Sequence, residues 1–115
     1  RADIASYRGD LAESLAVWRE LLAQDPQSID AAASIARLLT ELDGRDASVA
    51  FLRDLVDRFP HNVALIQTAA EFLREEQPDE AERLVRRLVE FNPVDPWARR
   101  ELAIVLTIQR RFDEA

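Results

Sequence analysis

The sequence contains no cysteine, and this absence excludes disulfide bonds, thiolate zinc sites and cysteine nucleophiles. It also contains no lysine, so all 15 basic residues are arginine. Arginine favours bidentate contacts with carboxylate or phosphate groups, although a biased base composition of the genome explains the same usage more simply. No apolar run approaches the roughly 20 residues needed to cross a bilayer, so we expect no membrane insertion in this segment.

Groups that support catalysis are also scarce. His61 is the only histidine, and the turn in which it lies, residues 60–62, contains no serine, cysteine or second histidine that could act with it in catalysis. The acidic clusters at 75–76 and 79–82 lack the loop spacing of a calcium site, and the two isolated glycines form no phosphate-binding loop. We therefore expect no enzyme, no catalytic residue, no cofactor and no metal.

The overall charge points away from nucleic acid as a partner. The net charge is −7 at pH 7, whereas binding to a phosphate backbone relies on a surplus of basic residues. Hydrophobic residues make up 48% of the chain, which is enough for a folded domain. The chain has no initiator methionine or signal-peptide pattern, and we expect it to be an excerpt of a longer protein whose compartment the sequence leaves open.

Apolar residues recur with the spacing of α-helices. Ile35, Leu38, Leu39 and Leu42 follow one another at intervals of three and four residues, and no long stretch alternates with period two. The two glycines, Gly9 and Gly44, fall where one helical run is expected to turn into the next.

Capping residues mark the ends of these helices. Ser28, Asp46 and Asp95 are predicted N-caps, and Pro78 suits the first position of a helix. Connections of two to four residues predict that successive helices run antiparallel. The predicted helices cover residues 1–8, 11–24, 29–42, 47–58, 63–76, 78–91 and 96–110, with a last helix beginning at Phe112.

A long period organises the whole chain. Pro26, Pro60 and Pro93 stand 34 and 33 residues apart, and each follows a bulky apolar residue by eight positions and a small residue by twelve. The bulky residues are Trp18, Leu52 and Val85, and the small ones are Ser14, Ser48 and Ala81. Such a period is typical of stacked repeats, in which each unit packs on its neighbours and the stack exposes one long surface.

These residues resemble the tetratricopeptide repeat, a helix–turn–helix unit with the pattern W-x2-L-G-x2-Y…A-x3-F…P. The first four positions of this pattern are filled in three successive units. They hold Ala32, Ile35, Ala36 and Leu39, then Ile66, Ala69, Ala70 and Leu73, then Arg99, Leu102, Ala103 and Leu106. The sequence departs from the pattern because aliphatic residues fill the aromatic slots and Arg99 replaces a tryptophan. The resemblance implies an all-α fold, a right-handed superhelical stack of antiparallel helix pairs. It implies one domain, 1–115, with a partial repeat 1–28, repeats 29–62 and 63–95, and a partial repeat 96–115.

The resemblance also implies a binding surface, since in this family the first helix of each pair lines a concave face. The candidate ligand-binding residues on that face are Tyr7, Arg37, Glu41, Gln67, Glu71, Arg74, Trp97, Arg100, Ile104 and Ile108. One arginine per unit and an apolar far end would complement a peptide with an acidic residue and a hydrophobic anchor. Two alternatives stay open. Arg37 and Arg74 could pair with glutamates on a solvated face, and Ile104 and Ile108 could pack on a further helix of the longer protein.

The expected function is a protein–protein interaction scaffold that binds a peptide or partner protein on its concave face. The alternative is a structural spacer or self-association module that supports a catalytic domain elsewhere in the longer protein. The apolar face of Leu102, Val105 and Leu106 lacks a partner helix in the sequence and favours self-association.

Overall fold

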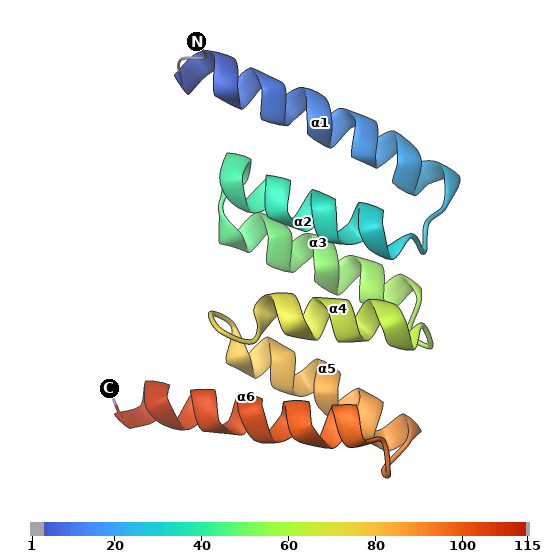
Figure 1. The fold of residues 1–115 in the computed structure, drawn as a ribbon, viewed down its shortest axis with the longest axis vertical. Coiled ribbons are helices and arrows are strands. Elements are labelled where there is room, and N and C mark those ends of the chain that lie inside the picture. Colours follow the sequence, from blue (N-terminus) through green and yellow to red (C-terminus); the bar gives the residue numbers. More distant parts are fainter. Residues whose placement is uncertain (1–3, 115) are drawn as a thin grey trace. The chain divides into compact units, whose positions relative to one another are not determined.

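The computed structural model describes the backbone of residues 4–114 and the side chains of residues 7–111, and this part of the chain is all-helical with no strand. The chain divides into two compact units, residues 1–59 and 60–115. Successive helices within each unit run antiparallel (Figure 1). The helices are α1 (Ile4–Gln24), α2 (Ile29–Asp43), α3 (Arg45–Arg58), α4 (Val63–Leu73), α5 (Pro78–Phe91) and α6 (Pro96–Glu114). The predicted all-α class is confirmed.

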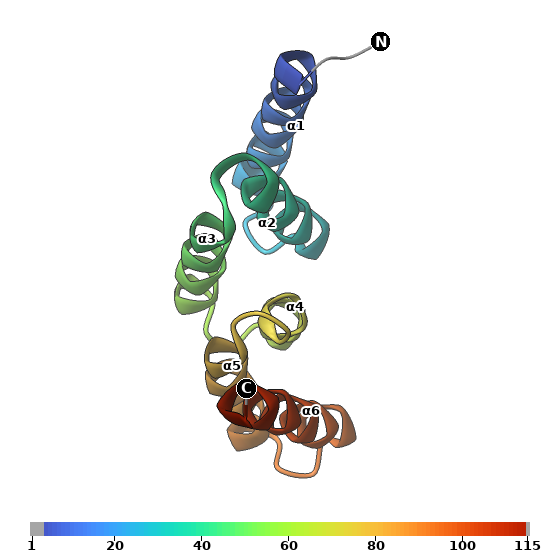
Figure 2. The same ribbon diagram turned by 90° about the vertical axis from the view of Figure 1, so that its left-hand side faces the viewer.

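In the first unit, α2 packs against both α1 and α3 (Figure 2). Its apolar stripe makes this possible, because Leu15 of α1 meets Ile35 and Leu39 of α2 in one buried cluster. Six partly buried apolar residues complete that cluster, namely Trp18, Leu22, Leu38, Leu42, Ala47 and Phe51. The spacing of three and four residues in α2 therefore marks its buried face, as predicted.

In the second unit, α5 packs against both α4 and α6. Ala70 of α4 and Ala81 of α5 are fully buried, and so is Ala98 of α6. Small side chains at these positions let the helix backbones approach closely, while Ile66 and Val85 fill the space beside them without any exposure.

Most of the predicted helix starts are confirmed. The Ser28 hydroxyl accepts a hydrogen bond from the Ala31 amide at 3.2 Å, and Pro78 is the first residue of α5. The carboxylate of Asp95 accepts from the Trp97 amide at 3.0 Å. The predicted cap at Asp46 is wrong because α3 begins one residue earlier, at Arg45.

Two predicted helix breaks are also wrong. Helix α1 continues through Gly9, where glycine costs about 0.5–1 kcal/mol relative to alanine but does not force a turn. The guanidinium of Arg8 donates to the Leu42 carbonyl at 2.9 Å and joins this part of α1 to the end of α2. Helix α6 likewise runs to Glu114 without a break before Phe112, since no glycine or proline lies near that position.

The helix predicted at 63–76 is shorter in the structure. Helix α4 ends at Leu73, and the Gln77 amide donates to the Leu73 carbonyl at 2.7 Å to close the turn before Pro78. A proline disfavours helical backbone at the residue before it, here Gln77. This explains why the helix ends before Gln77.

A polar link joins α5 to α6. The side-chain amide of Gln109 donates to Asp79 at 2.9 Å and to Glu82 at 2.6 Å. The Glu82 carboxylate also accepts from Arg86 on its own helix. The hydrogen bond from Arg86, and then the one from Gln109, lower the pKa of Glu82 below its ordinary value.

This lowered pKa predicts acid sensitivity. Because the folded pKa lies below the unfolded one, Glu82 contributes stability above its ordinary pKa of 4.5, and this contribution is lost as pH falls through the folded value. We expect Glu82→Gln to lower the free energy of unfolding by about 1 kcal/mol at pH 7. The difference from wild type should shrink as pH falls below about 4.5. Urea unfolding at several pH values measures it, with Glu13→Gln as an exposed control; a pH-independent difference would contradict the assignment.

Candidate functional site

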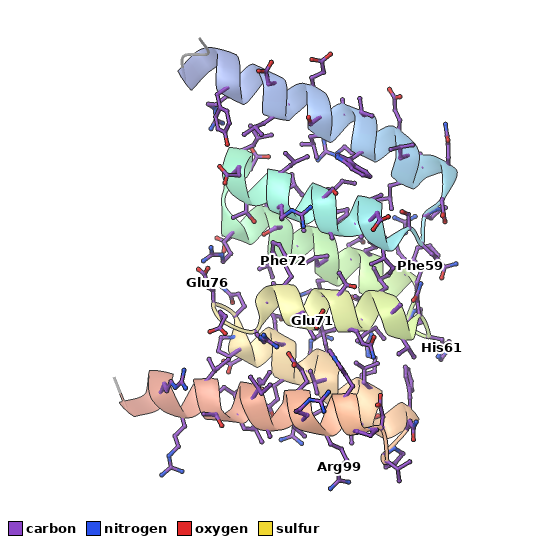
Figure 3. All side chains as sticks on the ribbon, viewed as in Figure 1. Phe59, His61, Glu71, Phe72, Glu76 and Arg99 are labelled. Atoms are coloured by element: carbon purple, nitrogen blue, oxygen red, sulfur yellow. The ribbon has the colours of Figure 1, made fainter. Side chains whose placement is uncertain are left out.

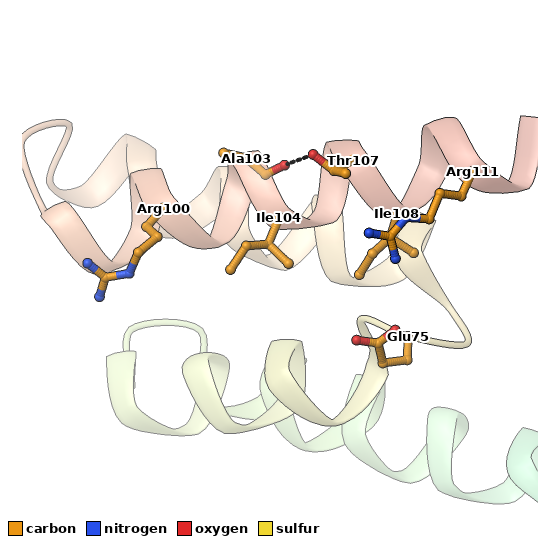
Figure 4. A pocket seen from close by; sticks show the side chains of 7 residues that line it. All are labelled: Glu75, Arg100, Ala103, Ile104, Thr107, Ile108 and Arg111. Atoms are coloured by element: carbon orange, nitrogen blue, oxygen red, sulfur yellow. Dashed lines mark hydrogen bonds between the residues drawn. The ribbon is translucent and has the colours of Figure 1, made fainter.

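A hollow of about 390 Å³ lies on α6 in the second unit (Figure 4). Its lining comes almost entirely from one side of that helix, and Glu75 from the turn after α4 completes it. The α6 residues are Arg100, Ala103, Ile104, Thr107, Ile108 and Arg111, which recur at the three- and four-residue spacing of a single helix face. We call this hollow the α6 pocket.

The floor of the α6 pocket is apolar. Ile108 is only 5% exposed, while Ile104 is 37% exposed and projects toward the side on which α4 lies (Figure 4). The Thr107 hydroxyl donates to the Ala103 carbonyl at 2.9 Å, so its hydrogen-bonding need is met within the helix. As a candidate ligand-binding residue, Ile108 was expected to be exposed, and this expectation is wrong. Ile108 lies on the buried side of α6 with Val105 and forms part of the pocket floor.

Arginines flank this floor. Arg100 and Arg111 are exposed, and their separation of eleven positions corresponds to about 16 Å along a helix. Neither shares the pocket with an acidic residue other than Glu75. The arrangement therefore offers an apolar surface with a cationic, bidentate hydrogen-bond donor toward each end.

Arg74 is held by a partner that the sequence did not reveal. Its guanidinium donates to both carboxylate oxygens of Glu101 on α6, at 2.9 and 2.8 Å. The Glu101 side chain is 5% exposed, and the hydrogen bonds to it raise the pKa of Arg74 above its ordinary value. Arg74, which directly follows α4, thus forms an ion pair with α6, and its predicted role as a ligand-binding residue stays a prediction.

The predicted alternative, in which Arg74 pairs with a nearby glutamate, is confirmed in part by an ion pair with Glu75. Glu75 lies 3.9 Å from the Arg74 guanidinium, a longer and more exposed contact than the one to Glu101. Glu101 falls in the same helical phase as the buried residues Ala98, Val105 and Ile108. This spacing could have shown from the sequence that Glu101 is paired, because an acidic residue on the buried side of a helix requires a cationic partner.

The other predicted site residues are distributed over both units. Tyr7, Arg37 and Glu41 are exposed in the first unit. In the second unit Glu71 lies on α4 (Figure 3) and is exposed, while Gln67 and Trp97 are partly buried. Among the predicted residues, the structure brings together Arg100, Ile104 and Ile108 in one pocket.

His61 has a packing contact. It lies in the turn before α4 (Figure 3), and its ring centroid is 5.8 Å from that of Phe91 at the end of α5. This contact ties the turn to α5.

No family model, curated protein or solved structure matches the chain. In addition, no helix in residues 4–114 has the length and apolar character required to span a membrane. Function is therefore inferred from the surface chemistry of the described residues.

Proposed function

We propose that the chain is a protein-interaction scaffold of the tetratricopeptide-repeat type, which binds a peptide or a segment of a partner protein. In this proposal the helix pairs stack as a right-handed α-solenoid whose first helices carry the binding surface. The 34-residue period and the antiparallel packing of neighbouring helices within each unit support the proposal.

The observation that carries the binding function is the α6 pocket. Its apolar floor suits one buried aliphatic side chain of a ligand, and Ile104 supplies an exposed apolar contact. Arg100 and Arg111 suit carboxylates on either side of that anchor. An extended peptide advances about 3.3 Å per residue, so acidic residues about five positions apart, with a leucine between them, match the spacing of the two arginines.

The binding test uses fluorescein-labelled ten-residue peptides with a central leucine. One peptide carries aspartates on both sides of the leucine, and its counterpart carries lysines at the same positions. We expect the acidic peptide to bind more tightly, and Arg100→Glu combined with Arg111→Glu to weaken its binding at least about tenfold, because each reversal replaces attraction by repulsion. Fluorescence anisotropy measures both affinities.

A matched control comes from the same helix. Arg99→Glu with Arg110→Glu makes the same change in net charge outside the α6 pocket, and this variant should bind the acidic peptide as wild type does. Equal binding of the acidic and lysine peptides would contradict the proposal. An equal loss in both double variants would show a general charge effect and would also contradict it.

A second candidate function is a structural spacer or self-association module. The observation favouring it is that the two outermost helices of the sequence expose large apolar side chains, with Val17 51% and Leu106 42% exposed. Within the predicted face of Leu102, Val105 and Leu106, Val105 is fully buried, so its predicted exposure is wrong.

A further inference from the structure

The outer face of α1 is both apolar and acidic. Val17 and Leu21 are 51% and 43% exposed, and the exposed residues Asp10, Glu13 and Glu20 lie beside them on the same side of the helix. We call these five residues the acidic stripe.

The arginines of α1 lie on other sides of the helix. Arg8 reaches the Leu42 carbonyl of α2, and Arg19 lines a hollow with Leu55 and Arg58 of α3. Within α1, Ile4–Gln24, no arginine therefore shares the side of the helix that carries the acidic stripe.

The outer face of α6 has the opposite charge. Arg99, Leu102 and Leu106 line a hollow of about 320 Å³ on α5 and α6, and Val89 closes it from the α5 side. Leu106 is 42% exposed, and Arg110 is exposed one turn further along. We call Arg99, Leu102, Leu106 and Arg110 the basic stripe. The only acidic residue between 96 and 111 is Glu101, which is buried against Arg74.

We propose that the basic stripe of one copy docks on the acidic stripe of a second copy, so that copies associate head to tail. Leucines of the basic stripe would pack against Val17 and Leu21, while Arg99 and Arg110 would meet Glu13 and Glu20. Charge complementarity selects this pairing, because two basic stripes or two acidic stripes would place like charges together. This proposal goes beyond the peptide-binding function and uses the side of α6 that adjoins the α6 pocket, where Ala103 lines both hollows.

The geometry of such a contact has two consequences. A contact between different surfaces leaves each copy with one stripe unoccupied, so assembly continues past the dimer unless the rotation closes a ring. The surface on a single helix is also smaller than that of a stable interface, so the association is weak and sensitive to salt.

The experiment is sedimentation equilibrium of the full chain from about 10 μM to about 1 mM, a range suited to weak association. We expect the average mass to rise with concentration beyond that of a dimer, and to rise less at high salt. Arg99→Glu with Arg110→Glu should weaken association at least about tenfold, as should Glu13→Arg with Glu20→Arg.

Mixing the two charge-reversed variants gives the decisive result. One variant has two acidic stripes and the other has two basic stripes, so each should remain monomeric alone. An equimolar mixture should associate again, because every contact in it pairs opposite charges. A mixture that remains monomeric overturns the proposal, as does a wild-type chain that is monomeric throughout.

A matched variant separates this contact from the peptide site. Arg100→Glu with Arg111→Glu should leave head-to-tail association within about threefold of wild type, since exposed substitutions outside a contact have small effects. Circular dichroism spectra and melting curves verify that every variant is folded. Loss of association in this variant to the same extent as in Arg99→Glu with Arg110→Glu would overturn the assignment to the basic stripe.

Discussion

Replacing Arg74 with alanine is expected to lower the free energy of unfolding by about 2–4 kcal/mol. The cause is Glu101, whose side chain is 5% exposed and whose two carboxylate oxygens both accept hydrogen bonds from the Arg74 guanidinium. Truncation of Arg74 leaves the Glu101 carboxylate buried without its counterion, and an unpaired buried charge strongly destabilises a fold. Because the Arg74 side chain is 33% exposed, water can reach the site in part, and the expected loss lies below that of a fully enclosed pair.

A double variant that lacks both charges tests this interpretation. Glu101→Leu combined with Arg74→Leu removes both charges and fills the space with apolar groups, so the double variant should lie within about 1 kcal/mol of wild type. Arg100→Ala, an exposed arginine near Glu101 in the sequence, should change stability by less than about 0.5 kcal/mol. Urea unfolding gives the free energies. Arg74→Ala and Arg100→Ala with equal stabilities would show that the ion pair does not stabilise the fold.

Hydrogen exchange adds the location of the effect. The Arg74–Glu101 pair joins α4 to α6 inside the second unit, so Arg74→Ala should speed exchange in α4–α6 more than in α1–α3. Uniform acceleration over the whole chain would instead indicate that the two units unfold as one.

The sequence predicts much of this fold because the signals involved are local. Helical spacing places Ile35 and Leu39 in the core, and both are buried. The small slot at Ser48 is buried as well, and its hydroxyl donates to the Arg45 carbonyl and accepts from Thr40. Capping chemistry at Ser28 acts over three residues and can be recognised without any tertiary information.

The sequence does not predict features that depend on contacts between distant residues. Whether Gly9 breaks a helix depends on the tertiary contacts of the helical turns on either side of it. Arg8, for example, donates to the carbonyl of Leu42, which is 34 residues away. Arg74 has glutamates at nearby positions 71 and 75, but its shortest ion pair is to Glu101, 27 residues away. Local spacing favours the nearby partner, while burial of Glu101 determines the actual one. Three of the residues that line the α6 pocket, Arg100, Ile104 and Ile108, could be grouped from the sequence because they share one helix face.

Replacing Leu39 with alanine is expected to lower the free energy of unfolding by about 2–5 kcal/mol. Leu39 is 4% exposed and packs in the cluster with Leu15 of α1 and Ile35 of its own helix. The substitution removes apolar contacts and leaves a cavity in the cluster. Since α2 packs on both α1 and α3, neither neighbour can close that cavity without losing contacts elsewhere.

Two further variants separate the cavity from a general effect of substitution. Leu39→Met conserves volume and should cost less than about 1.5 kcal/mol. Val17→Ala removes apolar atoms from a residue that is 51% exposed in the same unit, and it should cost less than about 0.5 kcal/mol. Urea unfolding ranks the three variants, with Leu39→Ala expected to be the least stable. Equal costs for Leu39→Ala and Val17→Ala would mean that Leu39 does not face the core, and the helical register of α2 would then be wrong.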